Sequence, residues 1–136
     1  ANLFVAGFFG SPPINLVAGK VGKSSNNQSY FEGLGTALAI PDEVPPPPAG
    51  NLTLGIHAED IEVATNTEVE TGQVFELCIE TIDDLGEAKI IHTKCGEAKI
   101  SVRAEYHTPL KDNIIQGRFN WTKVLWFNPQ TGERIP

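Results

Sequence analysis

The feature that most limits the folds open to this chain is an alternation of apolar and polar residues in short segments. Apolar residues occupy every second position within residues 73–83 and again within residues 100–105. Because successive side chains of a β-strand point to opposite faces, this period indicates strands with one buried and one wet face. The apolar residues concerned are Phe75, Leu77, Ile79, Ile100, Val102 and Ala104.

Turn signals separate many other short, strand-like segments. The 136 residues include 13 glycines and 10 prolines, and no long helical period is present. Many short strands with a turn signal at roughly every ten residues are typical of a small β-barrel or a pair of barrels. We therefore expect an all-β fold in which residues 73–83, 88–94 and 100–105 form an antiparallel meander. The other expected strands are 14–21, 30–32, 36–40, 114–119 and 124–127.

The first nine residues predict a short N-terminal helix. Asn2 suits the N-cap position, and the apolar residues that follow recur at helical spacing. The Pro-Pro step after Ser11 then ends the helix. We expect residues 1–13 to be a tail and linker and residues 14–136 to be the folded domain. The helix either docks on this domain or is the last helix of a missing upstream domain.

The charge balance disfavours nucleic-acid binding. The net charge is −7, and affinity for a phosphate backbone comes mostly from lysine and arginine. A free-standing module for single-stranded nucleic acid is one alternative function, and it needs exposed aromatic residues beside basic ones. Trp121, Lys123 and Trp126 come nearest, with one positive charge among them. We expect no nucleic-acid partner.

The histidines and cysteines do not predict a metal site. His57, His92 and His107 lie far apart in the sequence, and neither cysteine belongs to a C-x-x-C pair. We expect no dedicated metal site. Cys78 and Cys95 are expected to be reduced and buried, because the chain is large enough to have its own core, although a disulfide between them is the less favoured alternative.

Catalysis is not expected either. The stretch Gly19–Ser25 lacks the first glycine that a phosphate-binding loop requires. Asp83 and Asp84 are adjacent, and adjacent residues of a strand point to opposite faces, so we expect them to solvate a turn rather than to act as an acid and base pair. The chain is expected to have no catalytic residue and to bind no cofactor of its own.

Residues 54–61 combine a strand end, a backbone break and a short helical turn. Leu54 and Ile56 occupy alternate positions, as in a half-buried strand. Glu59 and Asp60 suit the first turn of a helix, where free N–H groups favour negative charge. We expect the rest of the chain to be arranged around this corner.

The corner resembles a phrase of a known protein family. Residues 54–60 read Leu-Gly-Ile-His-Ala-Glu-Asp, similar to the Leu-Gly-Ile-Arg-Pro-Glu-Asp corner in the C-terminal regulatory domain of ATP-binding subunits from carbohydrate ABC importers of the maltose and glycerol-phosphate type. His57 and Ala58 depart from that phrase. The junction at residues 4–15, the hairpin at residues 85–92 and the turn at residues 127–134 resemble the same family, in the expected order.

This resemblance implies an OB-like double barrel of the transport-associated (TOBE) type, appended to an ATPase. Residues 1–13 would come from the missing nucleotide-binding domain, which would hold ATP and magnesium. The implied partners are a second copy of the subunit in a homodimer, the upstream nucleotide-binding domain, the membrane subunits of the transporter and, in some members, a regulatory protein. The implied location is the cytoplasm, at the inner face of the cell membrane.

The resemblance also implies a function and a set of interface positions. The function is non-catalytic regulation and dimerisation of the ATPase subunit of a transporter for sugars or related solutes. An effector-binding domain that senses a small molecule is the second alternative, and the net charge disfavours an anion as that effector. The expected interface or signal-transmitting residues are Gly10, Ser11, Pro12, Asn15, His57, Glu59 and Asp60.

Overall fold

The computed structural model describes residues 12–64, 73–106, 108, 110 and 112–136, and these residues are mainly β-structure. The 3₁₀ helices η1 (Ala58–Asp60) and η3 (Trp121–Lys123) interrupt the strands. The described helices have neither the length nor the apolar character needed to cross a bilayer. The helix expected at residues 1–9 lies outside the described residues. The strands are β1 (Asn15–Lys23), β2 (Ser29–Gly33), β3 (Thr36–Ala39), β4 (Gly50–Ile56), β5 (Ile61–Ala64), β6 (Phe75–Asp84), β7 (Ala88–Cys95), β8 (Ala98–Glu105), β9 (Ile114–Phe119), β10 (Leu125–Phe127) and β11 (Arg134–Ile135).

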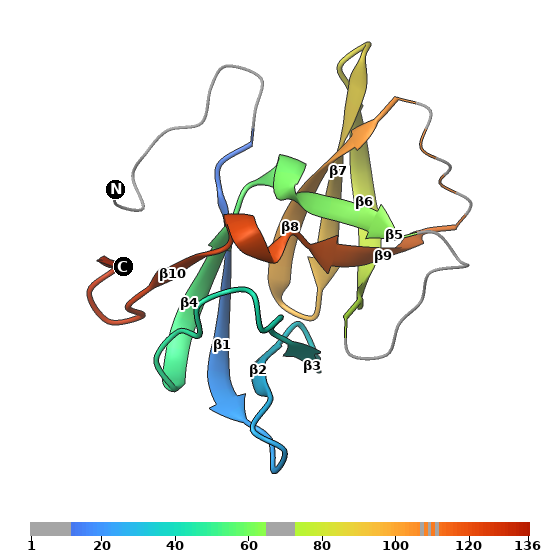
Figure 1. Cartoon of the computed structure of the whole chain (residues 1–136). Coiled ribbons are helices and arrows are strands. Elements are labelled where there is room, and N and C mark those ends of the chain that lie inside the picture. The colour runs from blue at the N-terminus through green and yellow to red at the C-terminus, as the bar shows by residue number, and fades with distance from the viewer. Residues whose placement is uncertain (1–11, 65–72, 107, 109, 111) are drawn as a thin grey trace.

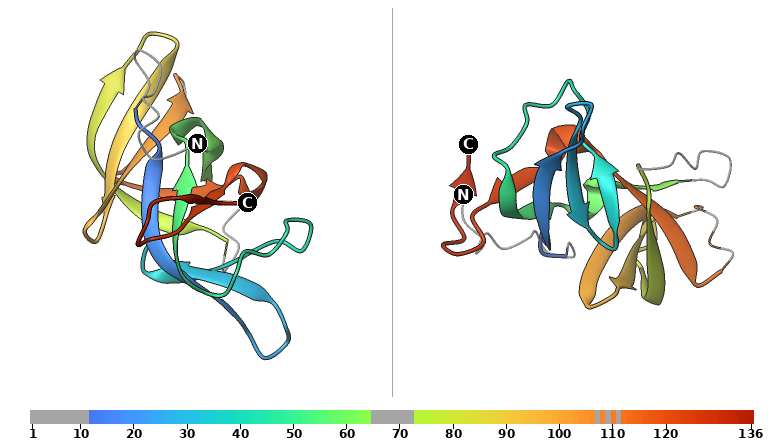
Figure 2. Two further views of the ribbon diagram at one scale, coloured as in Figure 1. Left: turned by 90° about the vertical axis from the view of Figure 1, so that its left-hand side faces the viewer. Right: turned by 90° about the horizontal axis from the view of Figure 1, so that it is seen from below.

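The strands form two antiparallel sheets that lie against one another (Figure 1). The strand order is β11-β10-β4-β1-β2-β3 in the first sheet and β5-β9-β6-β7-β8 in the second. Figure 2 shows that both sheets are strongly twisted and curled. The predicted class, an all-β and OB-like pair of barrels, is confirmed, with each barrel built as a curled sheet.

The expected meander is present as β6, β7 and β8. The phrase Gly-Glu-Ala-Lys-Ile occurs at residues 86–90 and 96–100 and leads into β7 and β8 respectively. Gly86 and Gly96 have φ angles of 90° and 60°, a left-handed conformation that glycine adopts at little cost. The repeated phrase therefore reflects two turns that each place a glycine with positive φ just before a strand. Asp84 has the expected turn role, because its Oδ1 accepts a hydrogen bond from the N–H of Gly86 at 2.8 Å.

Residues 50–64 and 114–127 run antiparallel to each other through both sheets. In the first sheet β4 pairs with β10, and in the second β5 pairs with β9. Between the two pairs, each stretch leaves one sheet and enters the other through its 3₁₀ helix (Figure 1). The N–H of Asn120 donates to the carbonyl oxygen of Asp60 at 2.9 Å. The two crossings therefore lie together between the sheets.

One hydrophobic cluster of described residues spans both sheets. A chain of aromatic rings runs through it from Phe75 to Phe119, Trp121, Trp126 and Phe31, with successive ring centroids 4.5, 5.5, 6.4 and 5.6 Å apart. Aromatic pairs at such spacings contribute about 0.5–1.5 kcal/mol each beyond their buried area. Phe75 belongs to the second sheet and Phe31 to the first, so this chain of rings passes through the crossings. Trp126 is buried and offers no exposed face on which a nucleic-acid base could stack.

The C-terminal end differs from the prediction by one strand. The sequence predicts the last strand at residues 124–127, whereas β11 follows and pairs with β10. Oδ1 of Asn128 accepts hydrogen bonds from the N–H groups of Gln130 and Thr131 at 2.8 and 3.2 Å, and Gly132 has a φ of 76°. This turn folds the chain back onto β10. A strand of two residues carries no alternation, so the sequence pattern gives no sign of it.

Replacing Gly19 with alanine tests the packing of β1 on β2. A Cβ at this position would collide with Cζ of Phe31 and with the carbonyl oxygen of Glu32. We expect Gly19→Ala to lower the free energy of unfolding by about 1–3 kcal/mol, because overpacking forces neighbouring atoms to shift. Urea denaturation followed by tryptophan fluorescence measures this change. Lys20→Ala, at an exposed position of the same strand, is the control and should change stability by less than about 0.5 kcal/mol; equal stability of the Gly19→Ala and unmodified proteins would contradict the packing.

Candidate functional site

The corner between β4 and β5 is held by apolar residues on both sides of a polar one. Ile56, Ala58 and Ile61 are buried, whereas His57 between them is exposed. His57 has an extended backbone, with φ −75° and ψ 154°, and its carbonyl oxygen accepts a hydrogen bond from the N–H of Asp60 at 3.0 Å. The predicted helical turn at this corner is confirmed as the 3₁₀ helix η1.

Side chains of His57, Glu59 and Asp60 converge on the outer side of this corner, and we call them the corner cluster. One imidazole nitrogen and one oxygen from each carboxylate lie within 4.8 Å of one another. His57 and Glu59 are exposed, and Asp60 is half-buried. Within the described part of the chain, no hydrogen bond or ion pair involves these side chains.

Asn15 joins the two sheets through its side-chain amide. Its Nδ2 donates to the carbonyl oxygen of Ser101 at 2.8 Å, and its Oδ1 accepts from the N–H of Ser101 at 2.8 Å. Asn15 begins β1 in the first sheet, and Ser101 lies on β8, the last strand in the order of the second sheet. The amide therefore satisfies the outward-facing backbone groups of an edge strand, which would otherwise need water or another chain. Asn15 is itself 5% exposed, as a side chain in such a bond is expected to be.

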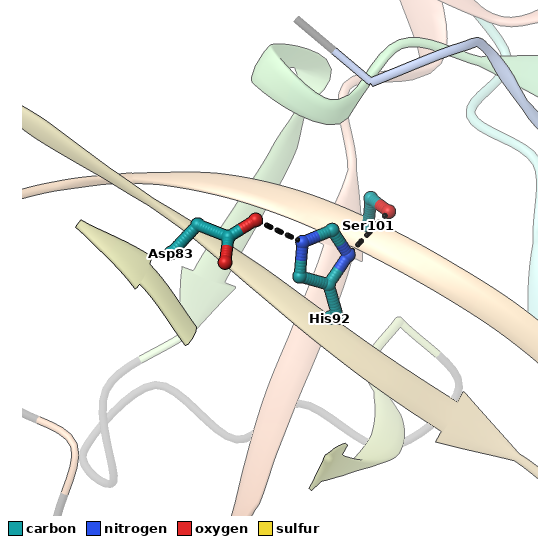
Figure 3. Close-up of polar contacts among 3 residues, drawn as sticks. All are labelled: Asp83, His92 and Ser101. Atoms are coloured by element: carbon teal, nitrogen blue, oxygen red, sulfur yellow. Dashed lines mark hydrogen bonds and ion pairs between the residues drawn. The ribbon is translucent and has the colours of Figure 1, made fainter. Parts of the chain in front are cut away.

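The side chain of Ser101 continues this contact across the second sheet (Figure 3). Ser101 lies opposite His92 in the β7–β8 ladder, and its Oγ is 3.4 Å from Nδ1 of the imidazole. Nε2 of the same imidazole is 2.8 Å from Oδ2 of Asp83 on β6. One histidine thus bridges three neighbouring strands on the outer face of the meander. Asp83 was expected to solvate a turn, but its carboxylate instead pairs with His92.

These three residues share the composition of a catalytic triad but not its geometry. The Asp83 side chain is 65% exposed, whereas the aspartate of a working triad is buried against its histidine. The 3.4 Å separation between Ser101 Oγ and His92 Nδ1 exceeds the roughly 2.6–3.2 Å at which a base activates a hydroxyl. The arrangement is a polar clasp across strands, and it does not make a nucleophile of Ser101.

Most of the predicted interface residues come together in the structure. Asn15 lies opposite Ile56 in the β1–β4 ladder, so it is close to the start of the corner cluster. Pro12 is half-buried shortly before it in the chain. Gly10 and Ser11 lie outside the described residues. The contact of Asn15 with Ser101 could not be read from the sequence, because the register of β8 against β1 is set by tertiary packing.

A cavity of about 410 Å³ adjoins the corner cluster. Its lining includes three carboxylates and one guanidinium. Such a site attracts cations and repels anions. The lining residues are Glu59, Glu87, Ala88, Arg103, Ala104 and Glu105.

The two cysteines are free thiols with different surroundings. Cys78 is exposed on β6, so the expectation of a buried residue is wrong there; the alternation that buries Leu77 turns Cys78 outward. Cys95 is half-buried on β7, and its Sγ donates to the carbonyl oxygen of Leu34 at 3.3 Å. Burial raises the pKa of the Cys95 thiol above its ordinary value of 9.0, and the nearby charges of Cys78 and Glu76 raise it further.

Comparison with known proteins finds relatives that align with nearly the whole chain. No family profile matches it. It is 34% identical over 136 residues to the sn-glycerol-3-phosphate import ATP-binding protein UgpC of Pectobacterium atrosepticum, covering 99% of this chain and 36% of that protein. It is 28% identical over 142 residues to the ABC transporter ATP-binding protein YurJ of Bacillus subtilis, covering 99% of this chain and 38% of that protein. The chain belongs with the C-terminal part of ABC-importer ATP-binding subunits. It spans little more than a third of their length.

A solved structure supports the fold of this chain. The cytoplasmic molybdate-binding protein ModG superposes with a TM-score of 0.63 over 85% of this chain and 96% of that chain. The sequence identity is 13%, so the likeness concerns the fold alone. ModG therefore supports the OB-like architecture that the resemblance implied.

Three of the four phrases that resemble the ABC-importer family lie where the backbone changes direction, and most of the fourth, at residues 4–15, lies outside the described residues. Residues 54–60 form the end of β4 and the crossing through η1, residues 85–92 include the β6–β7 turn, and residues 127–134 form the turn before β11. These are places where only a few backbone conformations and residue types fit. The shared phrases thus mark the geometry of the fold.

Asn15 variants test the bond between the sheets. We expect Asn15→Ala to lower the free energy of unfolding by about 1–3 kcal/mol, because it leaves the N–H and carbonyl of Ser101 without their partner. Asn15→Asp should also destabilise, because its carboxylate oxygen replaces the donor and faces that carbonyl oxygen. Asn51→Ala, at an exposed position of β4, is the matched control and should stay within about 0.5 kcal/mol. Urea denaturation gives all three values, and unchanged stability of Asn15→Ala would show that the hydrogen bonds between Asn15 and Ser101 do not stabilise the fold.

The thiols should differ in reactivity and in their effect on stability. At mildly alkaline pH, iodoacetamide should label Cys78 before Cys95, because the raised pKa of Cys95 keeps less of it as thiolate. Mass spectrometry of the digest measures the order, and Cys78→Ser isolates the slower site.

The folded state holds the Cys95 proton more tightly than the unfolded state does. Its contribution to stability is therefore present below pH 9.0 and is lost as the pH rises through the raised value; faster labelling of Cys95 would contradict both expectations.

Proposed function

We propose that this chain is a non-catalytic regulatory and dimerisation domain of the ATPase subunit of a transporter that imports sugars or related solutes. One observation carries the proposal. Nearly the whole chain, 99%, aligns with ATP-binding subunits while spanning only 36% to 38% of their length. The aligned part has an OB-like fold and lacks the G-x-x-x-x-G-K-[ST] motif, so ATP hydrolysis falls to the rest of the subunit.

On this proposal, ATP and magnesium bind outside the chain, in the nucleotide-binding part of the subunit. The stretch nearest to a phosphate-binding loop, Gly22-Lys23-Ser24, lies where β1 enters a hairpin turn, and the N–H of Ser24 donates to the carbonyl oxygen of Gln28 at 2.9 Å. A phosphate-binding loop instead leads from a strand into the N-terminus of a helix, whose free N–H groups hold the anion. The described residues of this stretch therefore do not form a phosphate-binding loop.

The proposed partners are those that the resemblance implies for such a domain. They are a second copy of the subunit, the upstream nucleotide-binding domain, the membrane subunits of the transporter and a regulatory protein. The proposed location is the cytoplasm, at the inner face of the cell membrane. The names of the relatives, an import ATP-binding protein and an ABC transporter ATP-binding protein, support the membrane subunits as partners and the cytoplasm as the location.

The physical role is to shift an equilibrium between two states of the transporter. A domain that pairs, or is bound by a regulator, in one state only shifts that equilibrium by the difference in its affinities. We assign the contact or transmission role to Asn15 and the corner cluster, because both lie beside the crossings that link the sheets. Gly10, Ser11 and Pro12 belong to the stretch that leads into Asn15.

Direct sensing of a small anion is less well supported. ModG is a molybdate-binding protein, but an identity of 13% transfers only the fold. The cavity beside Glu59 presents three carboxylates against one guanidinium, which repels an oxyanion. We therefore favour a surface that other proteins contact.

Sedimentation over a wide range of protein concentration tests the pairing. We expect the sedimentation coefficient to rise as the concentration approaches the millimolar range. Leu16 is 39% exposed beside Asn15, and Leu16→Asp should weaken the association, because it places a charge in an apolar contact. A protein that stays monomeric at millimolar concentration would remove dimerisation from the proposal.

Ile114→Asp is the matched control for this experiment. Ile114 is similarly exposed, at 46%, but it begins β9, at the end of that strand farther from η3. It should associate like the unmodified chain. Equal weakening by both variants would mean that the effect is not specific to the side of the molecule near Asn15.

A further inference from the structure

We infer that the corner cluster is a binding site for a divalent transition-metal cation of the zinc class. An imidazole and two carboxylates are ligands that Zn²⁺ takes in proteins. His57, Glu59 and Asp60 supply one such ligand atom each, all within 4.8 Å of one another. This site goes beyond the proposed regulatory function and does not depend on it.

The separations suit a single ion. Ligand atoms about 2.0–2.2 Å from a tetrahedral zinc ion lie roughly 3.4 Å apart, so the donors need only a small further approach. Because His57 and Glu59 are exposed, rotation about their side-chain bonds can supply it without moving the backbone. With three protein ligands, the fourth position of a tetrahedral ion is left for water.

The backbone of the corner holds the three positions in place before any ion binds. Glu59 and Asp60 belong to the 3₁₀ helix η1, and His57 is the extended residue at its N-cap. The hydrogen bond from the N–H of Asp60 to the carbonyl oxygen of His57 closes the turn. The buried residues Ala58 and Ile61 anchor it to the core. Asn120, in the second crossing, donates to the carbonyl oxygen of Asp60, so both crossings support the site.

The local charge also favours a cation. A neutral imidazole and two carboxylates carry a charge of −2, which one divalent ion balances. Glu87 and Glu105 line the cavity that Glu59 also lines, with Arg103 as the opposing charge. Among the described residues, none forms an ion pair with the corner cluster. Bringing two carboxylates together without a cation is unfavourable because like charges repel, and a bound ion removes that repulsion.

Calorimetric titration of the tag-free Cys78→Ser protein with ZnCl₂ tests the site, because this background removes the exposed thiol as a competing ligand. We expect one ion per chain, and weaker binding as the pH falls, since metal ligands must be deprotonated. His57→Ala should lower the affinity about tenfold or more. The exposed position of His57 allows this variant to fold, and unchanged circular dichroism confirms that it has.

His92→Ala in the same background is the matched control. His92 also lies beside a carboxylate, with its Nε2 2.8 Å from Oδ2 of Asp83. Among the described residues, however, it does not belong to a group of three possible metal ligands. Its removal should leave zinc affinity within about twofold, well short of the loss expected for a ligand. Absence of binding to the Cys78→Ser protein, or an equal loss in His57→Ala and His92→Ala, would overturn the inference. Failure of the pairing experiment would not affect it, because zinc binding is measured on its own.

Discussion

The structure depends on the meeting of two chain crossings at one place. Residues 50–64 and 114–127 both pass from one sheet to the other there, and the hydrogen bond from Asn120 to Asp60 links them. On either side of this bond, the β4–β10 and β5–β9 ladders continue the same antiparallel pairing. A slip of one residue in either ladder would turn buried side chains outward, so each sheet fixes the register of the other. The aromatic chain from Phe75 to Phe31 fills the same region.

Local order in the sequence predicts the parts of the fold that depend on near neighbours. The alternation around Leu77 and Val102, together with the turns at Gly86 and Gly96, gives the meander with its correct strand order. Alternation does not predict which distant strands pair, because many different pairings would bury the same apolar faces. The bond between Asn15 and Ser101 joins residues 86 positions apart, and no local pattern encodes it.

In the candidate site too, the features that depend on near neighbours could be predicted from the sequence, and those that depend on distant contacts could not. The corner at residues 54–61 carries its own signals, a strand end followed by acidic residues suited to a turn, and the structure has this turn as η1. The clustering of His57 with Glu59 and Asp60 could not be inferred from spacing between histidines and cysteines alone. It requires the tight turn that the hydrogen bond from the N–H of Asp60 to the carbonyl oxygen of His57 closes. The bridge from Asp83 through His92 to Ser101 requires the register of three strands.

The position of Asn15 has a mechanical consequence. It is the first residue of β1, and its amide grips β8, the outermost strand of the opposite sheet, through two hydrogen bonds. A pull on the segment ahead of Asn15 therefore reaches the far sheet directly, without first deforming the apolar interior. Close-packed interiors resist gradual distortion, so such a pull would tilt one sheet against the other as a rigid body. The two hydrogen bonds between the Asn15 amide and Ser101 limit the force that this linkage can transmit before it breaks.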